Sequence, residues 1–168
     1  MSLKGKKSMK TKIYLDTSIP SAFYDTSKPV RQLMTQKWFE HEADNFDLYI
    51  SKLTIEEIKR IRTPEKLLKI MELLASHTIA VLDITEEALA LGEEYMSKGA
   101  IPVSEPEDAY HIAIATVNGI EALASWNFKH IVSINPIRKI HEINLARQYQ
   151  IIEIGSLEIF GGACYGNL

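Results

Sequence analysis

The stretch Lys12-Ile-Tyr-Leu-Asp-Thr-Ser18 indicates the fold class of this chain. Residues 12–16 form a short β-prone run, and Thr17 or Ser18 can cap a brief helix that continues to Phe23. A buried strand that passes directly into a helix is the repeating unit of α/β proteins. The rest of the chain shows whether this unit recurs.

Four further β-prone runs follow, at residues 47–51, 78–82, 122–126 and 150–154. Helical patterns separate them, at residues 29–38, 54–62, 63–74, 85–98, 104–118 and 135–148. Gly99 and Gly119 stand where two of these helices should end. Five short apolar strands separated by helices predict an α/β fold, a three-layer α/β/α sandwich with a mostly parallel five-stranded sheet.

Length and composition fit one globular domain. The chain has 168 residues, within the roughly 100–200 residues usual for a domain. Apolar residues make up 46% and charged residues 24%, which argues against general disorder. No apolar run approaches the roughly 18 residues that span a membrane, and a single cysteine excludes a disulfide scaffold and a cysteine zinc site. We therefore expect a cytoplasmic protein without a membrane anchor.

The first residues differ from the rest of the chain. Residues 1–8 combine three lysines with glycine and serine, and Met9 stands just before the first strand. We interpret residues 1–8 as a leader or disordered start and residues 9–168 as a single domain. Without these lysines the formal charge falls from −3 to −6. A nucleic-acid partner must therefore be held by local basic patches.

Acidic residues follow the predicted strands, where parallel sheets place their functional groups. Asp16 ends the first strand, and Asp108 lies in the first turn of the helix at 104–118. In the helix at 54–62, Glu57 rather than Glu56 shares a face with Ile61. Each residue alone has an ordinary explanation, as a helix N-terminal charge or a surface glutamate.

Together, these three carboxylates can converge at one edge of the sheet. Converging carboxylates repel one another, and protons or a divalent ion neutralise them. Oxygen ligands without a cysteine or histidine cluster favour Mg²⁺ or Mn²⁺ over zinc. Mg²⁺ leaves coordination positions for a phosphate oxygen and an attacking water, which is the chemistry of phosphodiester hydrolysis.

Four segments carry a resemblance to a known family: Ile13-Tyr-Leu-Asp-Thr-Ser18, Ile50-Ser-Lys-Leu-Thr-Ile-Glu-Glu-Ile58, Glu107-Asp-Ala-Tyr-His-Ile-Ala-Ile-Ala115 and Ala124-Ser-Trp-Asn-Phe-Lys-His-Ile131. In this order and spacing they resemble the PIN-domain nucleases, particularly the VapC-like toxins of bacterial and archaeal toxin–antitoxin pairs. The resemblance extends from Lys12 to about Leu157. It implies a Mg²⁺- or Mn²⁺-dependent endoribonuclease that selects single-stranded RNA, with an antitoxin protein as partner.

The resemblance also implies roles for four residues. Asp16, Glu57 and Asp108 occupy the first three acidic positions of the family pattern. We expect Asp16 and Asp108 to be metal ligands, and Glu57 to bind the metal through water or to act as the base of that water. At the fourth position the family usually has an acidic residue, and this chain has Asn127. We expect Asn127 to be an accessory residue, because its amide oxygen can coordinate a metal ion but supplies no charge. This departure weakens the expectation of a second metal.

The residues around this site have two interpretations each. Three hydroxyl side chains stand at strand ends, where they can hold water or phosphate or simply cap helices: Thr17, Ser18 and Ser125. His111 is either a core histidine or a contact of the site. Four basic side chains follow the motifs and are either RNA contacts or solvated charges: Lys52, Lys129, His130 and Arg138. We expect Trp126 and Phe128 to pack rather than to stack on bases.

Three other functions remain open. A catalytically weakened PIN domain would bind RNA or protein, and Asn127 favours this alternative. A phosphatase or receiver domain needs a second aspartate two residues after Asp16, where Ser18 stands instead. A non-catalytic α/β protein with unrelated acidic caps is the third. A homodimer through the helices at 29–38 and 63–74 is compatible with their apolar faces, which a core explains equally well.

Overall fold

Five parallel strands form one sheet in the order β3-β2-β1-β4-β5. The computed structural model describes residues 10–161, so the leader predicted at residues 1–8 lies outside the described residues. The strands are β1 (Thr11–Leu15), β2 (Phe46–Ser51), β3 (Ile79–Leu82), β4 (Ala122–Ala124) and β5 (Glu153–Gly155). All four pairings are parallel, which confirms the predicted fold class.

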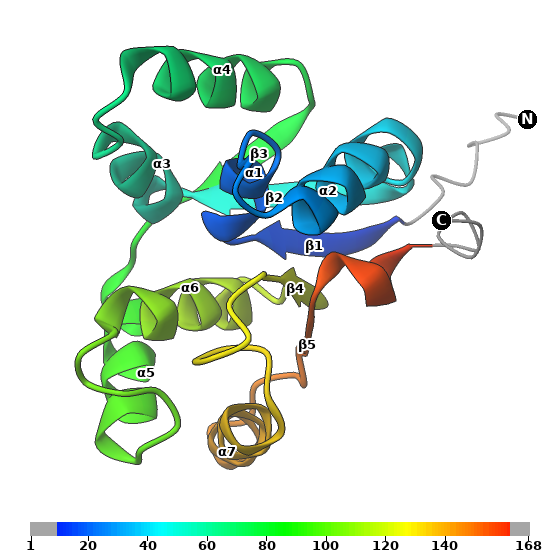
Figure 1. The fold of residues 1–168 in the computed structure, drawn as a ribbon. Helices are drawn as coiled ribbons and strands as arrows, with labels where there is room; N and C mark the ends of the chain where they lie inside the picture. Colours follow the sequence, from blue (N-terminus) through cyan, green and yellow to red (C-terminus); the bar gives the residue numbers. More distant parts are fainter. Residues whose placement is uncertain (1–9, 162–168) are drawn as a thin grey trace, which may run out of the picture.

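Helices cover both faces of this sheet (Figure 1). One layer contains α1 (Ser18–Ala22), α2 (Pro29–His41), α3 (Lys52–Lys59) and α4 (Pro64–Ala75). The other contains α5 (Glu86–Ser97), α6 (Pro106–Val117) and α7 (Ile134–Ala146). Two 3₁₀ turns, η1 (Ala43–Asn45) and η2 (Leu157–Phe160), complete the described elements. The predicted three-layer sandwich is therefore confirmed.

Strand β1 lies at the centre and divides the core into two parts. Ile13 and Leu15 pack into the cluster that includes Trp38 of α2 and Ile70 of α4. Tyr14, on the opposite face, packs into the cluster formed mainly by α5, α6 and α7. This alternation follows from the two-residue period of a strand. Helices α2 and α4 bury part of their apolar residues in this core, among them Trp38, Phe39 and Ile70, and leave others exposed.

Several element ends differ from the sequence expectation. Helix α6 begins at Pro106 rather than at residue 104, because proline is favoured in the first helical turn, where it has no N–H to leave unpaired. The last strand is Glu153–Gly155 rather than 150–154, because it pairs residue by residue with the three residues of β4. Gly99 and Gly119 end α5 and α6 with positive φ angles of 73° and 66°, as predicted.

Helices α5 and α6 approach closely, which fixes the position of α6 against the sheet. A Cβ atom added at Gly92 of α5 would lie 2.5 Å from Cδ1 of Tyr110 on α6. A side chain at this position would therefore clash with the Tyr110 ring. Within residues 10–161, no helix is both long and apolar enough to cross a membrane.

Candidate active site

Polar side chains gather at the carboxyl ends of the three adjacent strands β2, β1 and β4. Ser51 ends β2, Asp16 directly follows β1, and Ser125 directly follows β4. Helix α3 and the first turn of α6 lie at this same edge (Figure 1). The sheet order therefore brings together side chains that are far apart in the sequence.

Asp16 is buried and held by its neighbours. Its Oδ1 accepts hydrogen bonds from the Ser18 backbone N–H at 2.9 Å and from the Ser18 hydroxyl. Ser18 Oγ in turn accepts a hydrogen bond from the Trp126 backbone N–H at 2.8 Å, which links the ends of β1 and β4. Helix α1 has Thr17 as its N-cap, without a side-chain cap bond. The Ser18 hydroxyl thus positions a carboxylate instead of capping a helix.

The charge on Asp16 is costly where it lies. Burial raises the pKa of the Asp16 carboxyl above its usual range, while the His111 charge and the hydroxyls of Ser125 and Ser18 lower it. A buried carboxylate favours its charged form only if partners or a cation compensate for lost hydration. The hydrogen bonds from Ser18 and Ser125 do not offset the effect of burial, so the pKa of Asp16 remains raised.

Asp108 lies in the first turn of α6 and faces the same region. Burial and the Asp16 charge raise the pKa of Asp108 to about 6, against the lowering effect of His111 and His130. Asp16 directly follows β1 and Asp108 lies in the first turn of α6, so both are at the same edge of the sheet. Asp108 Oδ2 accepts a hydrogen bond from Asn127 Nδ2 at 3.0 Å and lies 3.3 Å from His130 Nδ1.

Asn127 has a fixed orientation in the loop after β4. Its Oδ1 accepts the His130 backbone N–H at 3.0 Å, so its NH₂ group is turned toward Asp108. Its own backbone N–H donates to Ser125 Oγ at 2.9 Å. The residue at the fourth motif position thus lies directly against the third motif carboxylate.

Glu57 reaches the site through a histidine. It points inward while Glu56 is exposed, as the spacing to Ile61 predicts. Its Oε1 contacts His111 Nε2. His111 Nδ1 lies 2.6 Å from Tyr14 Oη, which lies 2.7 Å from Ser51 Oγ. This chain of contacts connects α3, α6, β1 and β2.

His111 is a buried cation within the acidic region. Burial lowers the pKa of its imidazole, but Tyr14, the Glu57 carboxylate and Asp16 together raise it to about 10. In the protonated ring both nitrogens donate, Nε2 to Glu57 and Nδ1 to Tyr14. Both interpretations of His111 from the sequence therefore apply, since the ring is a core residue and contacts Glu57.

Sequence reasoning missed Tyr14 as part of this region. Its hydroxyl also lies 3.4 Å from Thr54 Oγ1, so it meets α3 as well as β2 and α6. The available signal was a tyrosine in a buried strand, because a buried tyrosine hydroxyl needs a hydrogen-bond partner.

The tightest group of potential metal ligands includes two residues that were not expected as ligands. Among residues 10–161, ligand atoms of Glu105, Asp108 and His130 all lie within 4.8 Å of one another. Of the residues expected as ligands, Asp108 belongs to this group. The charge of Asp16 contributes to the raised pKa of Asp108, and Glu57 contacts His111. Carboxylate oxygens with one imidazole form a donor set that fits a divalent cation.

Other expected contacts are used within the protein. Lys52 pairs with Asp83, so it is not a free RNA contact in this structure. Trp126 is buried, and its Nε1–H donates to Thr35 Oγ1 at 3.0 Å. Phe128 is 43% exposed, with the Arg31 guanidinium 5.2 Å from its ring centre. The packing expected for Trp126 is confirmed, and Phe128 lies at the rim.

The geometry agrees with comparisons to known proteins. The family model described as PIN domain matches residues 13–128. The fold is similar to that of the toxin VapC20 of Mycobacterium tuberculosis, described as cleaving the sarcin-ricin loop. The TM-score is 0.57 with 15% identity, over 71% of this chain and 92% of that chain.

A second solved structure also has a similar fold. It is VapBC2 of Rickettsia felis bound to a DNA fragment from its promoter, with a TM-score of 0.52 and 10% identity, over 86% of this chain and 97% of that chain. No curated protein matches the sequence significantly. The match to the family model covers more than half of the chain and includes all four motif positions. This chain belongs to the PIN domain family.

Proposed function

We propose that this protein is a metal-dependent endoribonuclease that hydrolyses RNA phosphodiester bonds, and that it is the cytoplasmic toxin of a toxin–antitoxin pair. One observation carries the proposal: the buried Asp16 and the partly buried Asp108 both lie at the carboxyl edge of the sheet, and the Asp16 charge adds to the effect of burial in raising the pKa of Asp108. Such an arrangement costs stability unless a cation is bound there.

The balance of charges supports a divalent cation. Asp16, Asp108 and Glu57 contribute three carboxylates, and the protonated His111 offsets one of them. Glu105 adds a fourth carboxylate close to Asp108. We assign Asp16 and Asp108 as ligands of Mg²⁺ or Mn²⁺, with Glu57 as an indirect ligand and Asn127 as an accessory residue.

A bound divalent cation would supply positive charge against the phosphate and lower the pKa of an attacking water. The protein itself holds the three carboxylates in position. Ser18 holds Asp16, Asn127 holds Asp108, and His111 holds Oε1 of Glu57. Glu57 Oε2 is then the atom we assign to accept the proton of the attacking water. Because one carboxylate oxygen is already held by His111, little conformational entropy is lost when the other oxygen takes up that proton.

The similar structures support the choice of substrate and partner. VapC20 is described as cleaving the sarcin-ricin loop, which supports single-stranded or structured RNA as substrate. VapBC2 is a complex, which supports an antitoxin protein as partner. Exposed apolar residues on α2 and α4, including Val30, Leu33 and Leu68, provide a surface for a homodimer.

A second function has a specific observation in its favour. Asn127 replaces the fourth acidic residue of the family pattern, and its N–H occupies an oxygen of Asp108 that a cation would use. A protein weakened in this way would act as an RNA- or protein-binding module without rapid cleavage.

Cleavage assays on a panel of unstructured and structured RNAs separate the two functions. Activity should disappear in EDTA and return with Mg²⁺ or Mn²⁺. Asp16→Asn should lower cleavage by at least about 100-fold, because even indirect partners of metal ligands contribute about 10–100-fold. The matched control is Asp47→Asn, an exposed aspartate in β2. Cleavage in excess chelator would exclude the metal mechanism, and RNA binding without cleavage in either metal would favour the binding module.

A further inference from the structure

A basic hollow lies beside the candidate active site. Its volume is about 400 Å³, within the range of small-ligand pockets, and it lies between the segment joining α5 to α6 and the segment joining β4 to α7. His130 belongs to both regions, because it lines the hollow and its Nδ1 is 3.3 Å from Asp108 Oδ2. A ligand in the hollow would therefore be close to the carboxylates.

The titratable side chains that line this hollow are all basic. Lys129, His130 and Lys139 line it, and no aspartate or glutamate does. Lys139 Nζ donates to Gly99 O at 3.1 Å, which leaves two ammonium protons for another acceptor. Neither lysine forms an ion pair within the part of the chain that the structure describes. In a chain of net charge −3, this is a local concentration of positive charge.

The hollow also has an apolar wall. Pro102 and Val103 line it, and Val103 is 76% exposed. Pro136, at the start of α7, contributes a third apolar side chain. A site with ammonium groups beside an exposed apolar wall matches a ligand that has both an anionic group and a flat apolar face. A nucleotide is such a ligand.

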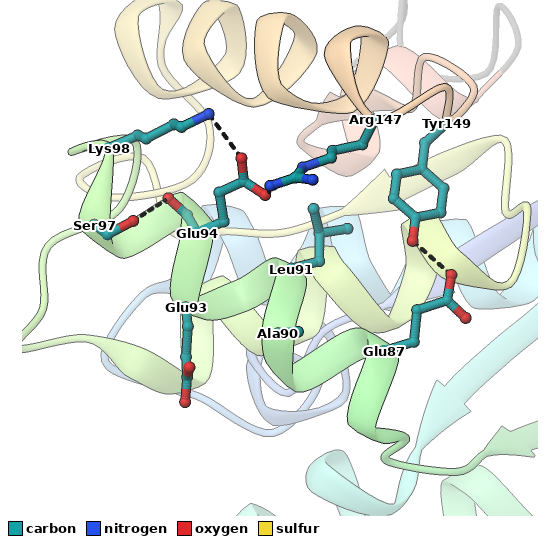
Figure 2. A pocket seen from close by; sticks show the side chains of 9 residues that line it. All are labelled: Glu87, Ala90, Leu91, Glu93, Glu94, Ser97, Lys98, Arg147 and Tyr149. Atoms are coloured by element: carbon teal, nitrogen blue, oxygen red, sulfur yellow. Dashed lines mark hydrogen bonds and ion pairs between the residues drawn. The ribbon is translucent and has the colours of Figure 1, made fainter.

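A larger hollow between α5 and the end of α7 does not have this chemistry (Figure 2). Its volume is about 640 Å³, and three glutamates line it. Glu94 lies between Lys98 at 2.7 Å and Arg147 at 2.8 Å, and Tyr149 donates to Glu87 at 2.5 Å. Its cations are therefore neutralised within the protein, and its acidic groups would repel a phosphate.

We propose that the basic hollow binds one nucleotide of the substrate RNA, adjacent to the phosphate that is cleaved. Lys129 and Lys139 each contact a backbone phosphate, and the wall of Pro102 and Val103 contacts the base. The proposal rests on the proposed nuclease function and adds a binding subsite to it. Its three basic residues follow residue 128, where the match to the PIN family model ends.

The test combines binding and kinetics on the full chain. The variant Lys129→Gln/Lys139→Gln should raise KM for a short unstructured RNA by at least about tenfold, because two phosphate contacts are lost, while kcat stays within about twofold. In equilibrium binding measured in chelator, the slope of log Kd against log salt should fall by about 1.4, since each contact to single-stranded RNA contributes about 0.7.

The matched control is Lys59→Gln/Lys66→Gln on α3 and α4, in the other helix layer, which changes the net charge by the same amount. Its KM and salt slope should equal those of the wild type. A second variant, Val103→Glu, places a negative charge on the exposed wall and should also raise KM. Circular dichroism of each variant establishes that it is folded.

The outcomes distinguish this proposal from the proposed function. If the wild type cleaves RNA and the basic-hollow variant has the same KM and salt slope, the subsite is wrong and the nuclease function stands. If the variant keeps its RNA parameters but loses affinity for an acidic peptide of the antitoxin, the hollow binds protein and the proposal is overturned. If the wild type neither binds nor cleaves RNA, the proposed function itself fails.

Discussion

Helix α6 carries a polar network near each end, and the two networks differ in charge. Near its start, Asp108 and His111 belong to the acidic region at the edge of the sheet. Near its end, Thr116 lies 3.3 Å from the Tyr95 hydroxyl and 3.4 Å from Asn144 Nδ2. The Tyr95 hydroxyl also donates to Asn144 Oδ1 at 2.5 Å. The second network is buried and contains no formal charge.

The difference shows how one helix serves both stability and function. The neutral network satisfies its own donors and acceptors and connects α5, α6 and α7, so it stabilises the fold without help from a ligand. The acidic network has more carboxylates than internal cations, and burial together with the Asp16 charge raises the pKa of Asp108 to about 6. Such a site costs stability in the absence of a ligand, as functional sites commonly do.

The largest expected change in stability is at the neutral end of α6. Replacing Asn144 by leucine removes the partner of the Tyr95 hydroxyl and leaves buried polar groups unsatisfied. We expect a loss of about 2–4 kcal/mol in the free energy of unfolding, measured by urea denaturation. The loss should be equal in chelator and in millimolar Mn²⁺, because this network does not contact the site.

The control for this change is Asn118→Leu, at the C-cap of the same helix, whose side chain donates to Ile114 O at 2.8 Å. This position is exposed, so the loss should stay below about 1 kcal/mol. A loss at Asn144 no larger than at Asn118, or one that depends on Mn²⁺, would contradict the separation of the two networks.

At the acidic end, removing a charge should stabilise the protein. The native pKa of Asp108 is about 6, above the usual 3.8, so the folded state binds more protons than the unfolded state between these pH values. Stability is therefore lost as pH rises through this window. Asp108→Asn removes this loss and should gain about 1–3 kcal/mol at pH 7 in chelator, since one pKa unit is about 1.4 kcal/mol.

Thermal or urea unfolding in chelator at pH 3.5, 5 and 7 measures this gain. The two proteins should be equally stable at pH 3.5 and diverge toward pH 7, while cleavage is lost in the variant. The exposed Asp47→Asn should follow the wild type at every pH. A variant that is less stable than the wild type at pH 7 would mean that Asp108 is a structural helix cap.

Much of the fold could be predicted because its signals are local. The alternation of Ile13, Tyr14 and Leu15 indicates a strand with both faces buried, and Gly99 and Gly119 mark helix ends by their positive φ angles. The position of β5 depends instead on pairing with β4, a contact between residues 31 positions apart, as in Ala122 and Glu153. A local pattern does not contain that register.

The site could be predicted only in part, for the same reason. Asp16 directly follows β1 and Asp108 lies in the first turn of α6, so their positions are visible in the sequence. The contact between Tyr14 and His111 joins residues 97 positions apart, and neither has an acidic pattern to indicate it. The approach of Glu105 to His130 likewise depends on how the loop after β4 folds back toward α6.

The smallest expected effect tests whether Asn127 belongs to the acidic network. In Asn127→Asp, one oxygen can still accept the His130 N–H, but the other replaces an NH₂ group 3.0 Å from Asp108 Oδ2. Without metal, this like charge should destabilise the fold by about 1 kcal/mol, because a hydrogen bond becomes a repulsion. With a divalent cation, the added ligand charge should tighten binding, since hard-cation sites tune their affinity by charge.

The two effects of Asn127→Asp have opposite signs, which distinguishes them from a surface substitution of about 0.5 kcal/mol or less. Melting curves of both proteins, each in chelator and in millimolar Mn²⁺, measure them. The control Gln150→Glu adds the same charge at an exposed position just before β5 and should not change the gain on adding metal. A larger gain in Asn127→Asp than in the wild type would place this residue beside the cation. Equal gains would place it outside the metal shell, and its contact with Asp108 would then serve only to orient that carboxylate.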